Sequence, residues 1–299
     1  MQTLSKNFTY DFHSAGNKPQ TTVKPGEVFF AETELATGGW LHSIEDTWAP
    51  EKSSALNPTV CVAIEGARPG DMLAVDILSV VPDSIGYTGF DVNLNPLANL
   101  IKTRDWGLNV KTVRIDPEFI HWSDDIKLPV KPMIGTLGTA PAHEVLSNAK
   151  GGSHGGNMDV QEVCPGSTVF LPVAVDGALL HIGDVHALQG DGEINCGGGI
   201  ECRSVAQLRV NIMKQPEDFR CVRIENDEYI MTVACERSLE DSFYLAAEQM
   251  LLWITDTYKH STDEAYLLMG QVLETRCTQF VNPTRSYICK MPKKYLRRV

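Results

Sequence analysis

The chain of 299 residues has no apolar run near the roughly 20 residues of a membrane-spanning helix, and its first residues lack the apolar core of a secretion signal. It is also short of positive charge, because 26 Lys and Arg oppose 38 Asp and Glu. The one basic run, 290–298, is typical of a solvated tail. Nucleic acid and membranes are therefore not expected as partners, and a cytoplasmic protein is expected.

The eight cysteines are scattered and form no Cys-x-x-Cys pair, which argues against a zinc knuckle or a disulfide framework. Most are predicted to be buried apolar fillers. Cys164, Cys196 and Cys202 could offer a thiol nucleophile, but such a thiol needs a base and an electropositive setting. Because Cys196 follows an acidic segment, a structural role is favoured for these thiols.

Alternating or continuous apolar stretches, broken by Pro-Gly and Asp-Gly turns, predict β-strands through most of the chain. Residues 59–65 and 72–81 are joined by a short turn and are expected to pair antiparallel. The Asp176-Gly177 turn predicts a hairpin between 168–173 and 178–182. Further strands are expected at 26–34, 132–141, 206–212 and 229–235.

Residues 83–128 interrupt this pattern with glycines and with the aromatic residues Tyr87, Phe90, Trp106 and Trp122. We expect an irregular excursion here. Such a segment either covers a cleft or an oligomer contact, or caps one end of the sheets.

The chain turns helical after about residue 236. Ser238 with Asp241 resembles a capping box, and apolar residues recur at helical spacing as far as Ile254. A second helix is expected from Thr262, and one or two closing strands at 278–289. The sequence, which has no internal repeat or linker, thus predicts a single domain over 1–299. Its fold class is mainly β, with antiparallel sandwich or barrel-like sheets in 1–235 and a smaller α+β part with about two helices in 236–299.

Polar groups concentrate in residues 181–193, which hold two imidazoles, three carboxylates and an amide among three glycines. Burying unpaired carboxylates costs several kcal/mol each, so a bound cation is an economical way to satisfy them. Asp184 and His186 lie two apart and would address one ion from the end of the predicted hairpin strand. A second cluster contains His154 and Asp159, and we hypothesise that the two loops meet at one metal-dependent site.

Two further carboxylates, Asp191 and Glu193, are separated by a single glycine. They could be metal ligands, a general base, or parts of a solvated turn. Glu201 could be a ligand or merely begin a strand. The glycine-rich run at 151–156 lacks the lysine and following helix of a phosphate-binding P-loop.

These motifs resemble the acetamidase/formamidase family. The segment His181 to Glu193, ending in Ile200-Glu201, is similar to the family's hallmark, and Glu65 to Asp71, Gly155 to Asp159 and 166–178 agree in order and spacing. The resemblance implies a largely β fold with a smaller helical part. It also implies a divalent metal, zinc first and calcium as the alternative, a homodimer or larger oligomer, and hydrolysis of short aliphatic amides to acid and ammonia.

One departure from the family pattern is the stretch Cys196-Gly197-Gly198-Gly199, which replaces the more usual Gly-Thr-Ala before Ile200. Because only the backbone path is altered there, the expected chemistry is unaffected and the substrate scope is the open question.

Metal-assisted hydrolysis is the expected mechanism. We expect Asp159, Asp184 and His186 as metal ligands, with His154 and Glu201 next. Glu193 or Asp191 would act as general base, and Gln189 or glycine-rich backbone N–H groups would bind the oxyanion. Two alternatives stay open: a calcium-holding β-domain that binds a ligand without catalysis, and a hydrolase of the same family that acts on larger amides or on an ester.

Overall fold

A computed structural model describes residues 2–90, 96–104, 109–195 and 197–296. Its elements are β1 (Gln2–Leu4), β2 (Phe12–Ser14), β3 (Thr22–Val23), β4 (Val28–Thr33), η1 (Pro50–Lys52), β5 (Thr59–Ile64), β6 (Asp71–Phe90), α1 (Ala98–Arg104), β7 (Asn109–Ile115), β8 (Phe119–His121), β9 (Lys127–Pro129), β10 (Met133–Thr139), β11 (Val145–Ser147), β12 (Gly151–Gly152), β13 (Gly155–Asn157), β14 (Thr168–Pro172), β15 (Leu180–Gln189), β16 (Gly197–Lys214), β17 (Val222–Glu225), β18 (Tyr229–Glu236), α2 (Leu239–Tyr258), α3 (Thr262–Val272), β19 (Glu274–Gln279), β20 (Arg285–Pro292) and η2 (Lys293–Tyr295). The expected mainly β fold is confirmed.

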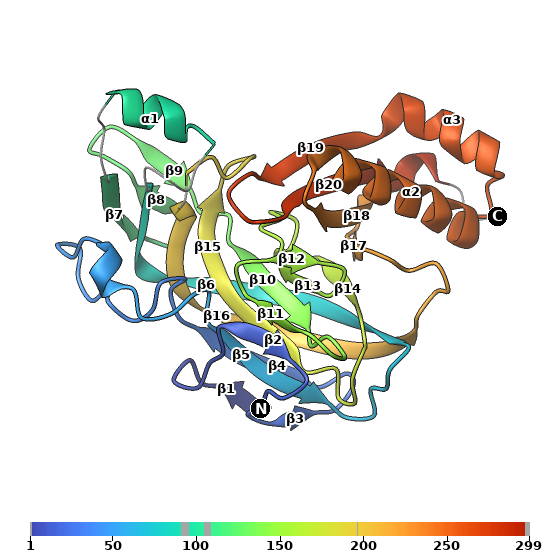
Figure 1. Cartoon of the computed structure of the whole chain (residues 1–299), viewed down its shortest axis with the longest axis horizontal. Helices are drawn as coiled ribbons and strands as arrows, with labels where there is room; N and C mark the ends of the chain where they lie inside the picture. The colour runs from blue at the N-terminus through green and yellow to red at the C-terminus, as the bar shows by residue number, and fades with distance from the viewer. Residues whose placement is uncertain (1, 91–95, 105–108, 196, 297–299) are drawn as a thin grey trace.

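Eighteen of these strands belong to one large sheet that curls like half of a barrel (Figure 1). Among the described pairings, only β1 with β4 and β3 with β5 are parallel. The longest ladder joins β6 to β16 and runs from Gly89 opposite Gly197 to Asp71 opposite Lys214. Shorter strands pair with both members of this ladder: β7 and β14 with β6, and β4 and β15 with β16.

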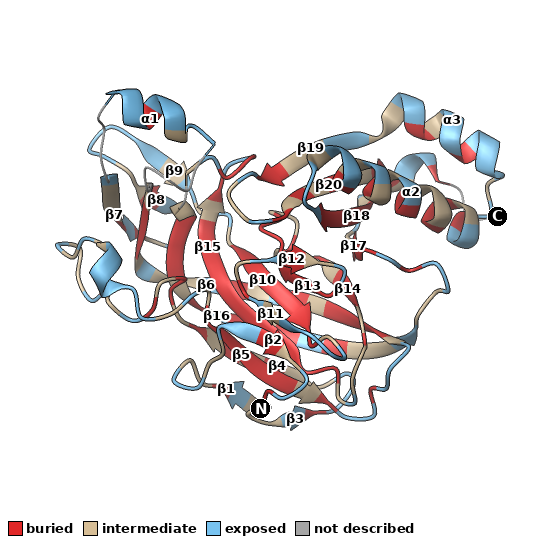
Figure 2. Ribbon diagram, viewed as in Figure 1, coloured by how far each residue is buried: buried red, intermediate tan, exposed pale blue. Residues whose placement is uncertain are grey.

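The strands β10 and β15 cross the interior of the curl. Every residue of β10 and all but one of β15 are buried, as Figure 2 shows in red. β15 pairs with β10 on one side and with β5 and β16 on the other. A strand enclosed in this way is normally apolar, so the polar residues of β15 stand out.

The helices α2 and α3 pack beside β18 and β20 in the C-terminal part (Figure 1). The Ser238 side chain accepts a hydrogen bond from the backbone N–H of Asp241 and caps α2, as the sequence predicts. Ser261 caps α3 in the same way through Glu264. A separate apolar cluster, which includes Trp253, lies between these helices and the sheet.

Both expected hairpins are wrong. In the described strand pairings, β5 lies beside β3 and β15, whereas β6 lies beside β7, β14 and β16. Likewise β14 pairs with β6 and β17, whereas β15 pairs with β5, β10 and β16. The described pairings therefore do not join β14 to β15. The turn residues do reverse the chain, but the two strands then join different parts of the curled sheet. As a consequence Asp184 and His186 lie inside β15 rather than beyond its end.

The expected irregular excursion at 83–128 is also largely wrong. β6 continues to Phe90, and β7, β8 and β9 add an antiparallel extension to it. A Cβ on Gly86 would lie 2.7 Å from the carbonyl oxygen of Glu201, so this glycine permits a close approach of strands rather than a loop. The aromatic residue Trp106 lies outside the described residues.

The basic run does not begin as a solvated tail. Lys290 lies in β20 with its Nζ 3.0 Å from a carboxylate oxygen of Glu162, and Lys293 forms an ion pair with Glu225. Arg297 and Arg298 lie outside the described residues. Within the described part of the chain, no helix has both the length and the apolar character needed to cross a bilayer.

Candidate functional site

Five side chains converge inside the curled sheet and form what we call the carboxylate cluster: Asp159, Asp184, His186, Glu193 and Glu201. Asp184 and His186 come from β15, and Glu201 comes from β16 directly opposite His186. Asp159 follows β13, and Glu193 lies in the loop between β15 and β16. Each is at most 5% exposed. The structure thus brings together residues that the sequence could place only in separate motifs.

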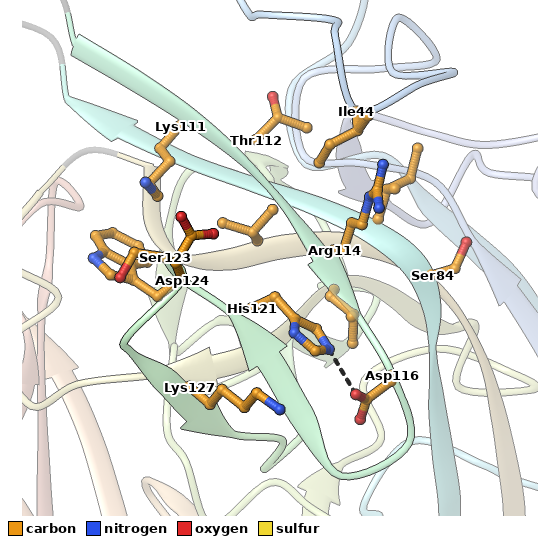
Figure 3. Close-up of a pocket in the computed structure, with 14 residues that line it drawn as sticks. Ile44, Ser84, Lys111, Thr112, Arg114, Asp116, His121, Ser123, Asp124 and Lys127 are labelled. Atoms are coloured by element: carbon orange, nitrogen blue, oxygen red, sulfur yellow. Dashed lines mark hydrogen bonds and ion pairs between the residues drawn. The ribbon is translucent and has the colours of Figure 1, made fainter.

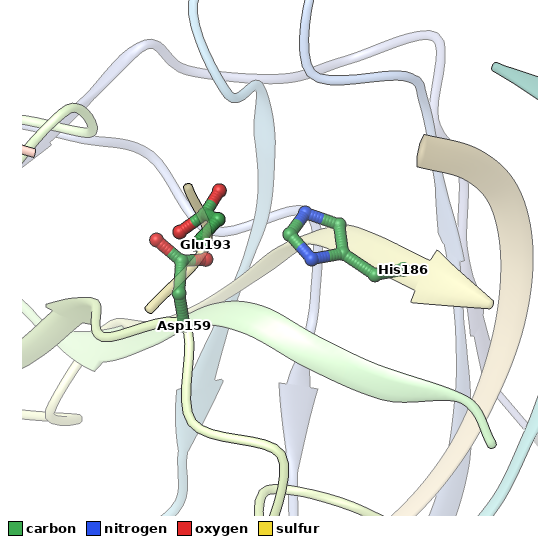
Figure 4. Close-up of side chains that lie close together, drawn as sticks. All are labelled: Asp159, His186 and Glu193. Atoms are coloured by element: carbon green, nitrogen blue, oxygen red, sulfur yellow. The ribbon is translucent and has the colours of Figure 1, made fainter. Parts of the chain in front are cut away.

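His186 is the centre of this cluster. Its Nε2 lies 3.2 Å from Glu201 Oε1 and 3.4 Å from Asp184 Oδ1. Its ring also faces the carboxyl groups of Asp159 and Glu193 (Figure 4). The five residues therefore form two overlapping groups of three that share His186, and the potential ligand atoms of each group lie within 4.8 Å of one another.

Three of the four carboxylate residues have an unusual backbone conformation. Asp159, Asp184 and Glu193 have φ angles of 50°, 58° and 42°, in the left-handed region that residues with a side chain seldom occupy. Each such residue costs of order 1–3 kcal/mol, and residues of this kind tend to occur at functional sites. At Asp184 the left-handed residue interrupts a buried strand.

Two glycines leave the space that the cluster fills. A Cβ on Gly135 of β10 would lie 2.5 Å from Asp159 Oδ1 and 2.7 Å from Asp184 Oδ2. A Cβ on Gly199 of β16 would lie 2.7 Å from the His186 ring. Any larger residue at either position would push the cluster apart.

Gln189 fixes the tautomer of His186. The Gln189 amide nitrogen donates to the backbone carbonyls of Asp159 and Thr278, at 2.9 and 3.2 Å. Its oxygen therefore accepts from His186 Nδ1, at 2.8 Å, and Nδ1 must carry a proton. That leaves Nε2, the nitrogen facing the carboxylates, as the atom free to bind a cation. Both amide hydrogens of Gln189 are used, so it is not placed as the expected oxyanion donor.

The cluster contains more charge than its own atoms can satisfy. Within the described residues, four of its buried atoms have no hydrogen-bond partner: Asp159 Oδ1, His186 Nε2, Glu193 Oε2 and Glu201 Oε2. Several buried, unsatisfied polar atoms in one cluster require an explanation, such as a bound ion or water.

Burial and mutual repulsion raise the carboxyl pKa values. Burial, followed by the Asp184 charge, raises the pKa of Asp159 to about 7. Burial and then Asp159 raise the pKa of Glu193 well above its ordinary range, and burial also raises the pKa of Glu201. Burial would lower the pKa of His186, but Glu201 and Asp184 outweigh it and raise that pKa. Without a cation, the cluster therefore retains protons that isolated carboxyl groups would lose.

A cavity of about 740 Å³ connects the cluster with the surface loops. Asp159, Asp184, Glu193 and Glu201 all line it, and so does Tyr87 of β6. The segment 83–128, which was expected to be an irregular excursion, therefore contributes Tyr87 to the lining of this cavity. Trp122 lines a different, open cavity of about 800 Å³ beside β7 and β8, where His121 Nε2 lies 2.6 Å from Asp116 Oδ2 (Figure 3).

His154 is not part of the carboxylate cluster. It belongs to a second buried group, here called the histidine cluster, in which the His13 ring centroid lies 5.1 Å from that of His154 and 4.4 Å from that of His181. Burial lowers the pKa of His154 to about 4 and that of His181 to about 3. The chain path explains the difference, because the backbone of His154 lies beside Gly138 of β10, three residues along the strand from Gly135, which borders the carboxylate cluster.

Asp191 also lies apart from the cluster. Its side chain is 62% exposed and accepts a hydrogen bond from Arg276 Nε at 2.7 Å. Of the two expected bases, only Glu193 lies in the buried site. The two residues are separated by Gly192, whose φ of 82° turns the chain so that Glu193 points inward.

The cysteines are poorly placed for nucleophilic attack. Burial raises the pKa of both Cys164 and Cys202, which keeps these thiols protonated. Cys202 is buried, and its Sγ lies 3.5 Å from the carbonyl oxygen of Val185. Cys196 lies outside the described residues.

Sequence reasoning missed Asn282, and it named Tyr87 only as one aromatic residue of the expected excursion, although both residues support the site. Asn282, in the loop between β19 and β20, donates from Nδ2 to Asp159 Oδ2 at 2.6 Å. Tyr87 is paired directly with Glu201 across β6 and β16. The Asn282-Pro283 pair marks a turn in the sequence, but no pattern in the sequence links it to a residue 123 positions earlier.

Comparison with known proteins places these features in a family. The sequence model of the Acetamidase/Formamidase family matches residues 11–153 and 148–283. The chain is 28% identical over 255 residues to an acetamidase from Mycolicibacterium smegmatis. That match covers 64% of this chain and 63% of the relative, so the chain spans less than two thirds of the relative's length.

Two solved structures resemble the whole chain. An acetamidase from Bacillus halodurans superposes with a TM-score of 0.90 at 31% identity, and the match covers 98% of each chain. A "predicted acetamidase/formamidase" from Thermoanaerobacter tengcongensis gives a TM-score of 0.92 at 31% identity, covering 99% of this chain and 96% of the other. From its sequence motifs, its fold and these matches, we conclude that the chain belongs to the acetamidase/formamidase family.

Proposed function

We propose that this protein is a metal-dependent amidase that hydrolyses primary amides, with short aliphatic amides such as formamide and acetamide as the starting substrates. The observation that carries the proposal is the convergence of four carboxylates and one imidazole in one buried cluster, in which four atoms have no hydrogen-bond partner. Family membership and the names of the relatives support amide hydrolysis.

The donor set of the carboxylate cluster fits a divalent cation. Asp184, His186 and Glu201 offer carboxylate oxygens and an imidazole Nε2 whose opposite nitrogen is held by Gln189, an arrangement typical of zinc ligands. Asp159 completes the set, and its carboxylate would also suit calcium, the harder alternative. A dication would offset the repulsion that otherwise raises the carboxyl pKa values.

Such a cation, when bound, supplies a Lewis acid that polarises the amide carbonyl and acidifies water. We assign the proton transfers to Glu193, because its Oε2 is buried, unpartnered and beside the cavity. Glu193 takes a proton from the attacking water as the new C–O bond forms, and gives it to the amide nitrogen as the C–N bond breaks. The products are a carboxylate and ammonia, which leaves as ammonium after taking up the second proton of the water.

Metal analysis and ammonia release test this proposal together. Purified protein is analysed for zinc and calcium by mass spectrometry, stripped with a chelator, and reloaded with each ion. We expect ammonia release from formamide or acetamide to be lost on stripping and restored by one of the ions. Full activity in protein shown to be free of metal would refute the metal dependence, and bound metal without cleavage of any amide would favour a ligand-binding domain.

A further inference from the structure

The cavity above the carboxylate cluster is larger than the smallest amides require. Its volume, about 740 Å³, lies in the range of about 300–1,000 Å³ that is typical of cavities enclosing drug-sized ligands. Acetamide carries a single methyl group beyond its amide. It would leave most of this space to water and would contact few of the lining side chains.

Two aromatic side chains, Tyr87 and Trp48, line one wall of the cavity, and contacts with residues such as Trp40 hold them in place. Tyr87 Oη and Trp40 Nε1 both lie 2.8 Å from Thr37 Oγ1, and the two rings meet edge to face at 4.9 Å. Trp48 packs against the same cluster, and its Nε1 donates to Ser53 Oγ at 2.9 Å. Because the indole N–H of Trp48 already has a partner in this wall, the ring offers the cavity mainly an apolar surface.

This wall begins directly beside the reacting groups. Tyr87 is the cross-strand neighbour of Glu201, and side chains opposite each other in an antiparallel pair have their Cβ atoms about 4.5–5.5 Å apart. An amide whose carbonyl carbon lies at the cluster would therefore extend its acyl group along the aromatic wall. The polar end and the apolar wall belong to one continuous cavity.

The outer part of the cavity is apolar as well. Leu56 lines it and is 47% exposed, and Val281 and Pro283 lie in the loop that also carries Asn282. A large exposed apolar side chain at the mouth of a cavity gains free energy when a ligand covers it. The cavity thus combines carboxylates at the cluster with several apolar side chains further out, although Asn57 and Arg285 also line it.

We propose that the favoured substrate of this site is an uncharged primary amide with an apolar aryl or alkyl body of roughly six or more carbon atoms. Its carboxamide reaches the carboxylate cluster, and its apolar body lies against Trp48 and Leu56. This inference rests on the proposed amidase function and specifies its substrate class. It selects the larger amides over the formamide-like substrates that the relatives' names suggest.

The test compares substrates on the metal-loaded protein. The values of kcat/KM are measured for formamide, acetamide, hexanamide and phenylacetamide by ammonia release. We expect kcat/KM for the last two to exceed that for acetamide at least about 10-fold, as one or more well-packed methylenes allow. Trp48→Ala should lower the phenylacetamide-to-acetamide ratio about 10-fold or more. Trp122→Ala, which removes the same side chain from the other cavity, should leave this ratio unchanged.

A binding measurement separates this inference from the proposed function. Phenylacetamide and acetamide are titrated by calorimetry into Glu193→Gln protein, with and without Trp48→Ala. Tighter binding of phenylacetamide that depends on Trp48 supports the inference even if no amide is hydrolysed, in which case only the proposed function fails. Hydrolysis in which acetamide is equal to or better than both larger amides would overturn the inference and leave the proposed function intact.

Discussion

Two buried histidines on the same strand, one in the histidine cluster and one in the carboxylate cluster, differ in almost everything except residue type. His181 and His186 are five positions apart on β15, and both are at most 1% exposed. His181 Nδ1 meets Thr59 Oγ1 at 2.8 Å, and its Nε2 meets the Asn17 amide at 3.2 Å. His186 Nε2 instead faces two carboxylates.

The neighbours decide what each histidine can do. In the histidine cluster, burial lowers the pKa values of His13, His154 and His181, so these rings stay neutral. His13 and His181 form hydrogen bonds with amide and hydroxyl groups, whereas Nε2 of His13 and Nε2 of His154 have no hydrogen-bond partner among the described residues. In the carboxylate cluster, the charges of Glu201 and Asp184 outweigh the effect of burial and raise the pKa of His186. A buried histidine is therefore a candidate ligand when carboxylates share its pocket, and a packing residue when amides and hydroxyls do.

The test with the largest expected effect replaces one histidine in each cluster by alanine. His186→Ala should lower kcat/KM at least about 10³-fold and abolish stoichiometric metal binding, because it removes the side chain shared by both potential ligand groups. His154→Ala should lower stability but leave the metal content unchanged. Metal content and ammonia release are measured on folded protein, verified by circular dichroism. Metal retained by His186→Ala, or lost from His154→Ala, would contradict this division.

A second comparison concerns the two carboxylates on either side of Gly192. Glu193→Gln should lower kcat about 10²–10⁴-fold, because the buried side chain can no longer accept a proton. Asp191→Asn should change kcat less than about 3-fold, since Asp191 is exposed and its pairing with Arg276 is a surface interaction. Steady-state ammonia release at saturating amide measures both. An equal loss of kcat in the two variants would show that Asp191 also takes part in the reaction.

The sequence predicts the chemistry of this site better than its architecture. Asp184 and His186 are two apart, and the spacing alone indicates that both can address one ion. Helix caps such as Ser238 are equally local, and the structure confirms them. The family motifs contain most of the cluster, so Asp159, Glu193 and Glu201 could be named before any strand was placed.

What failed were inferences that depend on distant partners. The Asp176-Gly177 turn indicates where the chain reverses, but nothing local indicates that β15 pairs with β5, β10 and β16 instead of β14. In the sequence Gly86 resembles a loop residue. The glycine is needed because the backbone of Glu201 passes close to it, and Glu201 lies 115 residues away in sequence. The sequence around His154 and His186 does not distinguish the roles of these two histidines, because their roles depend on their spatial neighbours.

The smallest expected effect concerns the acid stability of the histidine cluster. The unfolded chain protonates its histidines near pH 6.5, whereas the folded protein holds the pKa of His181 at about 3 through burial and the nearby His154. Between these values the unfolded state binds the extra proton, so this contribution to stability is complete above pH 6.5 and is lost as the pH falls. For one such group, the free energy of unfolding should drop by about 2 kcal/mol between pH 7 and pH 5.

The carboxylate cluster titrates over the same pH window with the opposite sign, because its raised carboxyl pKa values favour the folded state at low pH. The measurement must therefore be a difference between proteins. Urea unfolding of wild type and His181→Asn at pH 7 and pH 5 should show a drop about 2 kcal/mol smaller in the variant, whatever its stability at pH 7. The exposed His143 provides the matched control as His143→Asn. An unchanged drop in His181→Asn would mean that His181 takes up its proton in the folded protein, and the contrast between the two clusters would then lose its electrostatic basis.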